Sequence, residues 1–222
     1  MDDRFHFRRS GLILLVLVAY GLGVPGFAQT AKVERTGPVE VTLVPPQVAA
    51  ALEEKGYRVT LNDGWSAELW LARELKVTNK DKAGALYPGL SDGEFICIVS
   101  LPKGMSDFRG QAIAAGAYTL RYQYLPQDAN HMGVSPNPDF LLAIPAATYA
   151  DPSTNYPFRK LVSLSGKTTG AHPAVIAMDT AGEPGSAVFT ETKMLVFTVK
   201  VKSVPADQLQ RLGIVLRGQA TQ

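Results

Sequence analysis

The chain has 222 residues, of which 46% are hydrophobic and 19% are charged, and its formal net charge at pH 7 is +2. This near-neutral balance excludes a strongly basic nucleic-acid-binding protein, which needs clustered Lys and Arg to displace counterions from phosphate. Cys97 is the single cysteine, so no internal disulfide can form. Its apolar surroundings predict a buried strand residue with an inert thiol.

Residues 1–28 have the pattern of a secretory signal peptide. Three arginines precede an apolar run at 12–20, and Gly26-Phe27-Ala28 supplies small residues where a signal peptidase cleaves. Gly and Pro interrupt the apolar stretch before it reaches the ~20 residues that a spanning helix needs. We expect cleavage after Ala28 and export to the periplasm or the extracellular space, with no membrane span afterwards. An uncleaved membrane anchor is the alternative.

The segment after the leader predicts a tether and then one domain. Residues 29–38 are polar and lack periodicity, so we expect a flexible tether before a single domain at 39–222. Val39–Val44 is typical of a strand, which Pro45 and Pro46 end because proline donates no ladder hydrogen bond. Pro46 also suits the first turn of a short amphipathic helix that Gly56 can cap.

The clearest local signal in the chain is a β-hairpin. Tyr57–Leu61 and Trp65–Leu71 alternate in polarity and flank the turn Asn62-Asp63-Gly64. Arg73–Val77 fits both strand and helix, and residues 79–93 form a loop rich in charge, Gly and Pro.

The rest of the chain contains short strands and one further helix. The strand Ala117–Leu125 places four apolar side chains on one face and Thr119, Arg121 and Gln123 on the other. Pro157–Ser165 has helical spacing and is followed by Gly166. The other predicted strands are Glu94–Leu101, Phe140–Ile144, Ala174–Met178, Met194–Lys202 and Ile214–Arg217. This pattern predicts a mainly β fold, an antiparallel two-sheet β-sandwich with two short helices.

Three motifs resemble catalytic or metal-binding signatures but are incomplete. Gly89–Gly93 matches G-x-S-x-G, but a strand follows it where a nucleophile elbow needs a helix. Gly166-Lys167-Thr168 lacks the glycine that begins a phosphate-binding loop five residues earlier. Asp128–Gly133 begins like a calcium loop, but Met132 replaces an oxygen ligand. We expect these segments to form turns and a helix cap. An irregular cation site with oxygen ligands at Asp128–Gly133 is the alternative for the third motif.

The candidate ligand-binding residues come from loops that border the best strands and from the tyrosines beside them. Rigid scaffolds usually present functional groups on such loops, and aromatic faces bind sugars and peptides. The wider aromatic set is Trp65, Trp70, Tyr87, Tyr118, Tyr122 and Tyr124, for which core packing is the alternative. The predicted ligand-binding residues are Arg109, Tyr122, Tyr124, Asp128, Asn130, His131 and Asp139.

An alternative interpretation assigns a divalent metal ion to the same region. His131 and His172 are the two histidines after the leader, and carboxylates lie near His131 in the sequence. If the fold brings them together, Asp128, His131, Asp139 and His172 would hold one ion that activates water. No catalytic residue is assigned, and outside this alternative no cofactor is expected.

Several short sequence segments resemble those of a family of uncharacterised secreted bacterial proteins. They are Gly64–Leu71, Asp107–Gln111, Gly116–Tyr122, Gly133–Pro136, Asp139–Leu142 and His172–Val175. The segment around Gly116 is also similar to a broader domain-of-unknown-function family with β-sandwich architecture. The resemblance implies an exported bacterial single domain and carries no activity.

Together these features predict a non-enzymatic module of the bacterial envelope that binds a small ligand or an envelope protein. The stretch from Asp128 to Asp139 is its expected contact surface. The alternatives are a metal-dependent hydrolase or lyase that uses His131 and His172, and a structural module of an envelope assembly.

Overall fold

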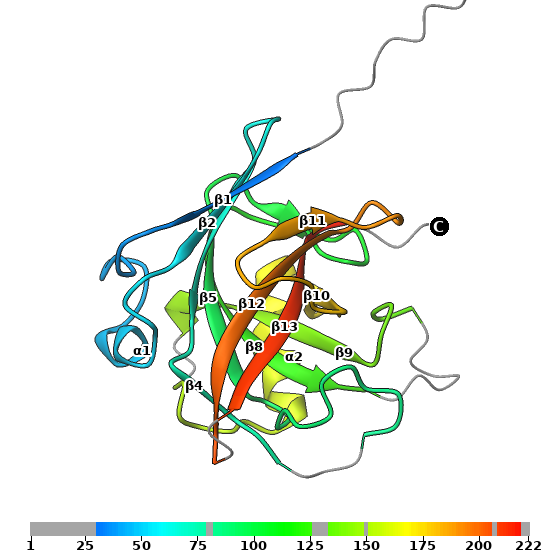
Figure 1. Ribbon diagram of the computed structural model, residues 1–222. Helices are drawn as coiled ribbons and strands as arrows, with labels where there is room; N and C mark the ends of the chain where they lie inside the picture. The colour runs from blue at the N-terminus through cyan, green and yellow to red at the C-terminus, as the bar shows by residue number, and fades with distance from the viewer. Residues whose placement is uncertain (1–29, 79–81, 126–132, 149–150, 206–207, 219–222) are drawn as a thin grey trace, which may run out of the picture.

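The computed structural model describes residues 30–78, 82–125, 133–148, 151–205 and 208–218, and these build a mainly β protein (Figure 1). The predicted leader at 1–28 lies outside the described residues. The helices are α1 (Pro46–Ala50), α2 (Phe158–Thr169) and the 3-10 turn η1 (Ala146–Thr148). The strands are β1 (Ala31–Arg35), β2 (Tyr57–Leu61), β3 (Ser66–Leu71), β4 (Glu74–Lys76), β5 (Phe95–Leu101), β6 (Met105–Ser106), β7 (Ala112–Ile113), β8 (Gly116–Tyr124), β9 (Asp139–Pro145), β10 (Ala174–Asp179), β11 (Ala187–Phe189), β12 (Leu195–Val204) and β13 (Gln208–Arg217).

Within the described part, eleven strands form one mixed sheet, and β6 and β7 form a small separate pair. The main sheet has the order β1-β2-β3-β5-β8-β9-β10-β13-β12-β11, and β4 adds to β12 as a parallel strand. β1 and β11 contact each other although they stand at the two ends of this order, so the sheet curls on itself (Figure 1).

The prediction of a mainly β fold is confirmed, but two separate facing sheets are not observed. β10 pairs with β9 over Ala174–Ala177 and with β13 through Met178 and Asp179. Because one strand is shared in this way, the hydrogen-bond ladder continues from one half of the sheet to the other. A curled, mixed sheet therefore takes the place of the antiparallel sandwich.

The sheet buries its concave face around a large core, and α2 covers part of the opposite face. Leu141 and Ala143 of β9 belong to the large core, whereas Phe140, Leu142 and Ile144 pack with Leu161 and Leu164 of α2. β9 is therefore buried on both faces, which explains its continuous apolar sequence. No helix in the described ranges is long and apolar enough to cross a bilayer.

The predicted hairpin is confirmed as β2 and β3, with Tyr57 opposite Leu69 and Thr60 opposite Ser66. The predicted tether is wrong over Ala31–Arg35, because this segment pairs as β1 along the whole of β2. Its polar composition fits a sheet edge, where one face stays in solvent.

The predicted strand at Val39–Val44 is also wrong. This segment forms turns, and both of these valines pack into the core without joining a ladder. The predicted helix ends at Ala50 and not near Gly56. A Cβ on Gly56 would meet the Leu69 carbonyl oxygen at 2.8 Å, so this glycine permits a close backbone approach instead of capping the helix.

Candidate functional site

Asp139, a predicted ligand-binding and metal-binding residue, is fully buried at the start of β9. Its carboxylate accepts hydrogen bonds from the backbone amides of Leu86 (2.6 Å) and Tyr87 (3.1 Å) and from the Tyr122 hydroxyl (2.7 Å). Burial and the contact with Asp139 raise the pKa of Tyr122, which is also fully buried. These two predicted site residues therefore fasten the loop at 82–90 to the sheet and do not reach solvent.

Tyr124 lies beside this network and is half-buried. The Lys82 ammonium lies 4.6 Å from the centroid of the Tyr122 ring and 5.4 Å from that of Tyr124. Lys82 also donates a hydrogen bond to Asp92 at 2.7 Å, and its side chain is almost fully buried. The Tyr124 hydroxyl donates to the Ala83 carbonyl at 2.9 Å, so both tyrosines pack against a cation and hold the loop by hydrogen bonds.

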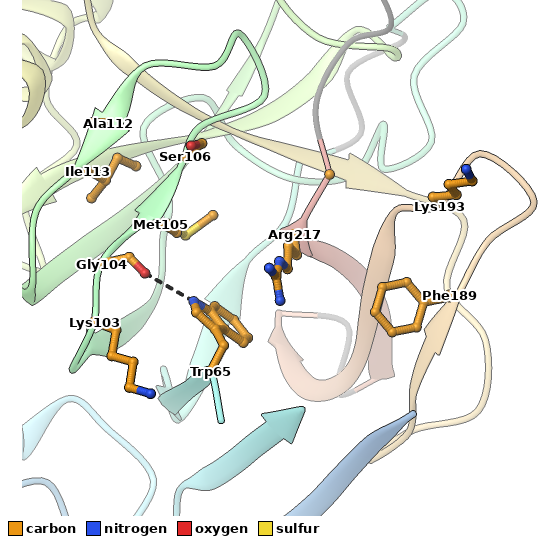
Figure 2. A pocket seen from close by; sticks show the side chains of 11 residues that line it. Trp65, Lys103, Gly104, Met105, Ser106, Ala112, Ile113, Phe189, Lys193 and Arg217 are labelled. Atoms are coloured by element: carbon orange, nitrogen blue, oxygen red, sulfur yellow. Dashed lines mark hydrogen bonds between the residues drawn. The ribbon is translucent and has the colours of Figure 1, made fainter. Parts of the chain in front are cut away.

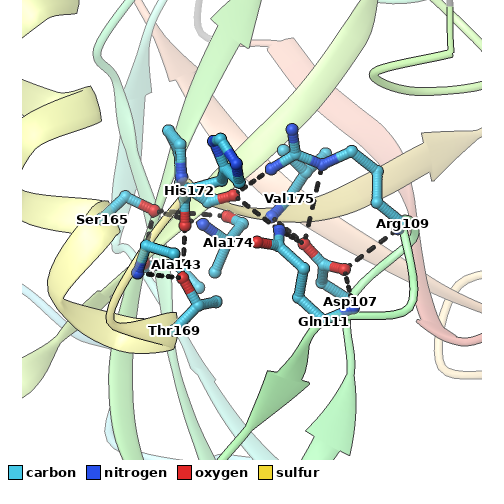
Figure 3. A network of polar contacts seen from close by, with 11 residues as sticks. Asp107, Arg109, Gln111, Ala143, Ser165, Thr169, His172, Ala174 and Val175 are labelled. Atoms are coloured by element: carbon cyan, nitrogen blue, oxygen red, sulfur yellow. Dashed lines mark hydrogen bonds and ion pairs between the residues drawn. The ribbon is translucent and has the colours of Figure 1, made fainter.

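Arg109 belongs to a different cluster, which forms around the buried carboxylate of Asp107 (Figure 3). Asp107 accepts hydrogen bonds from the amides of Arg109 (3.0 Å), Gln111 (2.8 Å) and Val175 (3.1 Å), and from the Gln111 side chain (2.7 Å). The Arg109 guanidinium donates to the Pro173 carbonyl. The cluster ties the β6–β7 connection to the beginning of β10.

His172 lies on the exposed connection between α2 and β10, close to this cluster (Figure 3). Ala174, two residues later, pairs with Ala143 of β9, whereas Asp139 begins β9. At about 3.3 Å per residue, the distance from Asp139 to Ala143 along the strand is about 13 Å. Arg109 and His172 therefore lie near one end of β9, and Asp139 lies at the other.

Asp128, Asn130 and His131 lie outside the described residues. Of the predicted metal ligands the structure describes Asp139 and His172, which stand too far apart to share an ion that needs ligand atoms within ~2.0–2.2 Å. Where the chain is described, no group of three or more His, Cys, Asp and Glu side chains gathers.

The incomplete motifs have structural roles. Gly89–Gly93 forms turns that lead into β5, and Gly166-Lys167-Thr168 lies inside α2 and not in a loop. Cys97 is fully buried in β5, as predicted, and burial raises the pKa of its thiol. The predicted helix stop at Gly166 is wrong, because α2 continues to Thr169 and Gly170 caps it in the left-handed conformation.

A pocket of about 610 Å³, which we call the basic pocket, lies where several connections meet (Figure 2). Trp65 enters it from the β2–β3 turn and Lys103 from the β5–β6 turn. Lys193 comes from the β11–β12 turn and Arg217 from the end of β13. Met105, Ile113 and Phe189 add apolar surface.

Positive charge dominates the basic pocket. Its charged lining residues are Lys103, Lys193 and Arg217, and none of the described lining residues is acidic. Asp63 lies outside the lining and pairs with Arg217. Hydrogen bonds from the Arg217 guanidinium and from the Trp65 amide hold the pKa of the Asp63 carboxyl below its usual range. One carboxylate near three cations leaves a positive excess, which favours an anion.

The Trp65 ring forms a fixed wall of the basic pocket. Its Nε1 donates a hydrogen bond to the Gly104 carbonyl at 3.0 Å, and the Arg217 guanidinium carbon lies 6.0 Å from the ring centroid (Figure 2). Gly104 has φ +70°, and a Cβ there would meet the Ile113 carbonyl oxygen at 2.4 Å. Only glycine permits this close approach, which holds the indole and the neighbouring Lys103 in place.

Lys193 is the one described non-glycine residue with positive φ, at 61°. The left-handed conformation costs an L residue roughly 1–2 kcal/mol relative to the right-handed one. Glycine would form the same turn without that cost. The strained turn places the Lys193 side chain in the lining of the basic pocket.

No local sequence pattern predicts the basic pocket. Trp65 is in the predicted aromatic set, but Lys103, Lys193 and Arg217 each stand alone in a different turn or strand end. Only the curl of the sheet brings these cations together.

No protein-family model, curated protein or solved structure matches the chain.

Proposed function

We propose that this protein is an exported, non-enzymatic binding protein of the bacterial envelope that takes a small organic anion in the basic pocket. Export follows from the leader at 1–28, and the bacterial setting follows from the sequence resemblance. The observation that carries the proposal is the convergence of three cationic side chains beside an indole ring.

The geometry favours an anion with a flat or apolar part. Arg and Lys donate charge-assisted hydrogen bonds to carboxylate and phosphate oxygens, and the lysine stems are long enough to close on a ligand. Trp65 and Phe189 offer ring surface for an apolar body. Two of the cations, Lys103 and Lys193, are exposed, so they can reorient toward a ligand without breaking core contacts.

Phenyl phosphate is a suitable probe, since it joins a dianion to an aromatic ring. We expect calorimetry to show binding of phenyl phosphate, weaker binding of inorganic phosphate, and none of phenol. The double variant Lys103→Ala/Lys193→Ala is expected to bind phenyl phosphate at least about tenfold more weakly, a difference of about 1.4 kcal/mol. Affinity should fall as salt increases.

Lys160→Ala, which removes an exposed lysine from α2, is the matched control and should bind like the unmodified protein. Equal affinity of the double variant and the control for phenyl phosphate would refute the assignment of the basic pocket. Binding of phenol as tight as that of phenyl phosphate would refute the requirement for an anion.

Lys193→Gly separates binding from folding. We expect this variant to gain about 0.5–1 kcal/mol of unfolding free energy, because relief of the left-handed strain at Lys193 exceeds the unfolded-chain entropy that glycine adds. The same change should weaken phenyl phosphate binding, because a cation is lost from the basic pocket. Urea denaturation and calorimetry measure the two effects, and a variant that loses stability would contradict the strain argument.

A further inference from the structure

A second pocket, which we call the Glu94 pocket, lies at the opposite end of the same strands. β5 begins at Phe95, which lines this pocket, and ends at Leu101, just before the basic pocket. β12 ends at Val204 beside β4, whereas its other end lies beside β11 (Figure 1). Seven strand residues span about 20 Å, so the two pockets are separate sites.

The Glu94 pocket has a volume of about 580 Å³. The carboxylate of Glu94 lines it, although this residue is only 8% exposed. One carboxylate oxygen, Oε1, accepts a hydrogen bond from the Lys76 amide at 2.7 Å, and no further hydrogen bond to this carboxylate forms among the described residues. An ionised carboxylate has about four acceptor positions, so most of the capacity of Glu94 is unused.

A comparison with Asp139 shows how unusual this arrangement is. Asp139 is fully buried, and three donors satisfy its carboxylate. A buried carboxylate costs free energy unless it is paired and hydrogen-bonded. Burial accordingly raises the pKa of Glu94, with the Lys76 amide bond and the charges of Lys76 and Arg121 opposing the shift.

The other charged groups around the pocket are already engaged. Glu74 pairs with Lys202 at 3.2 Å, and the Lys76 ammonium donates to the Ser153 carbonyl at 3.2 Å. The Asp151 carboxylate accepts hydrogen bonds within its own turn. Small and apolar residues form much of the remaining wall, namely Ala50, Ala51, Ala72, Phe95, Pro152 and Val204.

We propose that the Glu94 pocket binds a small organic amine, whose ammonium group donates hydrogen bonds to the Glu94 carboxylate while its apolar stem lies against the alanine and phenylalanine wall. An ammonium has three donors and no acceptor, so it matches the unused acceptor capacity and neutralises the buried charge. Gln47 and Ser153 are the uncharged polar residues of the lining, and most of the remaining wall is small or apolar, so an aliphatic amine fits better than a polyol.

Hexylamine is the probe, with hexanol as its neutral counterpart of equal length. Titrations followed by amide chemical shifts should show hexylammonium binding that perturbs Ala51, Ala72 and Phe95 and does not perturb the basic pocket. Hexanol should bind at least tenfold more weakly. Glu94→Gln should reduce hexylammonium affinity at least tenfold, and Glu74→Gln, at the rim, should reduce it less than threefold.

Glu94→Gln is expected to fold, because the glutamine oxygen can still accept the Lys76 amide hydrogen bond. The pKa of Glu94 in the folded protein lies above its unfolded value near 4.5. The native state therefore loses stability as the pH rises from the unfolded pKa through the folded pKa. Glu94→Gln should therefore unfold at a higher urea concentration than the unmodified protein at pH 7. This difference should shrink as the pH falls to 4.5 and below.

Three results would overturn the amine site. They are equal affinity for hexylamine and hexanol, wild-type affinity in folded Glu94→Gln, and no shift at millimolar hexylamine. Phenyl phosphate binding by Glu94→Gln serves as an independent check that the variant is native, since the basic pocket lies at the other end of β5.

Discussion

Asp139→Ala is expected to lower the free energy of unfolding by about 4 kcal/mol. The variant leaves the amides of Leu86 and Tyr87 and the hydroxyl of Tyr122 without their acceptor in a site that water does not reach. Each unsatisfied buried donor costs roughly 1–3 kcal/mol. Tyr122 keeps a weaker contact with the Tyr87 carbonyl at 3.3 Å, which limits the total loss.

Urea denaturation monitored by circular dichroism measures this effect. Tyr122→Phe is the matched variant, because it removes one of the three donors and leaves the carboxylate in place; we expect a loss of about 1 kcal/mol. Asp139→Asn should fall between the two, since its oxygen can still accept one amide. A loss below about 1 kcal/mol for Asp139→Ala would show that the loop at 82–90 is held by other contacts.

This network also shows what the sequence could and could not predict. The hairpin at 57–71 and the central strands follow from period-two alternation and from one strong turn signal, and these are local properties. Asp139 is equally visible in the sequence, but two of its three partners, Leu86 and Tyr87, lie more than fifty residues away. The sequence alone therefore suggested a surface ligand group where the fold needs a buried acceptor.

The elements that sequence analysis missed have weak local patterns. β1 is mostly polar because it is an edge strand, and β6 and β7 have two residues each, too few to show alternation. The cations of the basic pocket come from separate turns, so no spacing rule joins them. Their assembly depends on the pairing of distant strands, which a single sequence does not specify.

The burial of β8 differs from the pattern that its sequence predicts. Its alternation predicts one apolar face and one polar face with Thr119, Arg121 and Gln123, yet all three polar residues are buried. The loop at 151–156 covers this part of β8. The Arg121 guanidinium donates to the carbonyls of Gly93 (2.9 Å), Thr154 (2.9 Å) and Asp151. An arginine that the alternation places on the polar face of the strand thus connects a loop to the sheet.

Arg121→Met is therefore expected to cost about 3 kcal/mol of unfolding free energy, since several buried carbonyls lose their donor. Burial lowers the pKa of Arg121, so the native state already carries a desolvation cost that methionine removes, and the loss should stay below that of Asp139→Ala. The rings of Phe95 and Tyr156, whose centroids lie 5.7 and 5.1 Å from the guanidinium carbon, can pack against the methionine.

Hydrogen exchange distinguishes this mechanism from a general loss of stability. In Arg121→Met, amides at 151–156 should exchange at least tenfold faster, while amides of the β2–β3 hairpin change only with global stability. Arg121→Lys retains the charge but cannot reach several carbonyls with one ammonium, so it should resemble methionine more than arginine. Unchanged exchange at 151–156 in both variants would show that the guanidinium does not anchor this loop. More frequent opening of the loop at 151–156 should also weaken hexylamine binding, because Asp151, Pro152 and Ser153 line the Glu94 pocket.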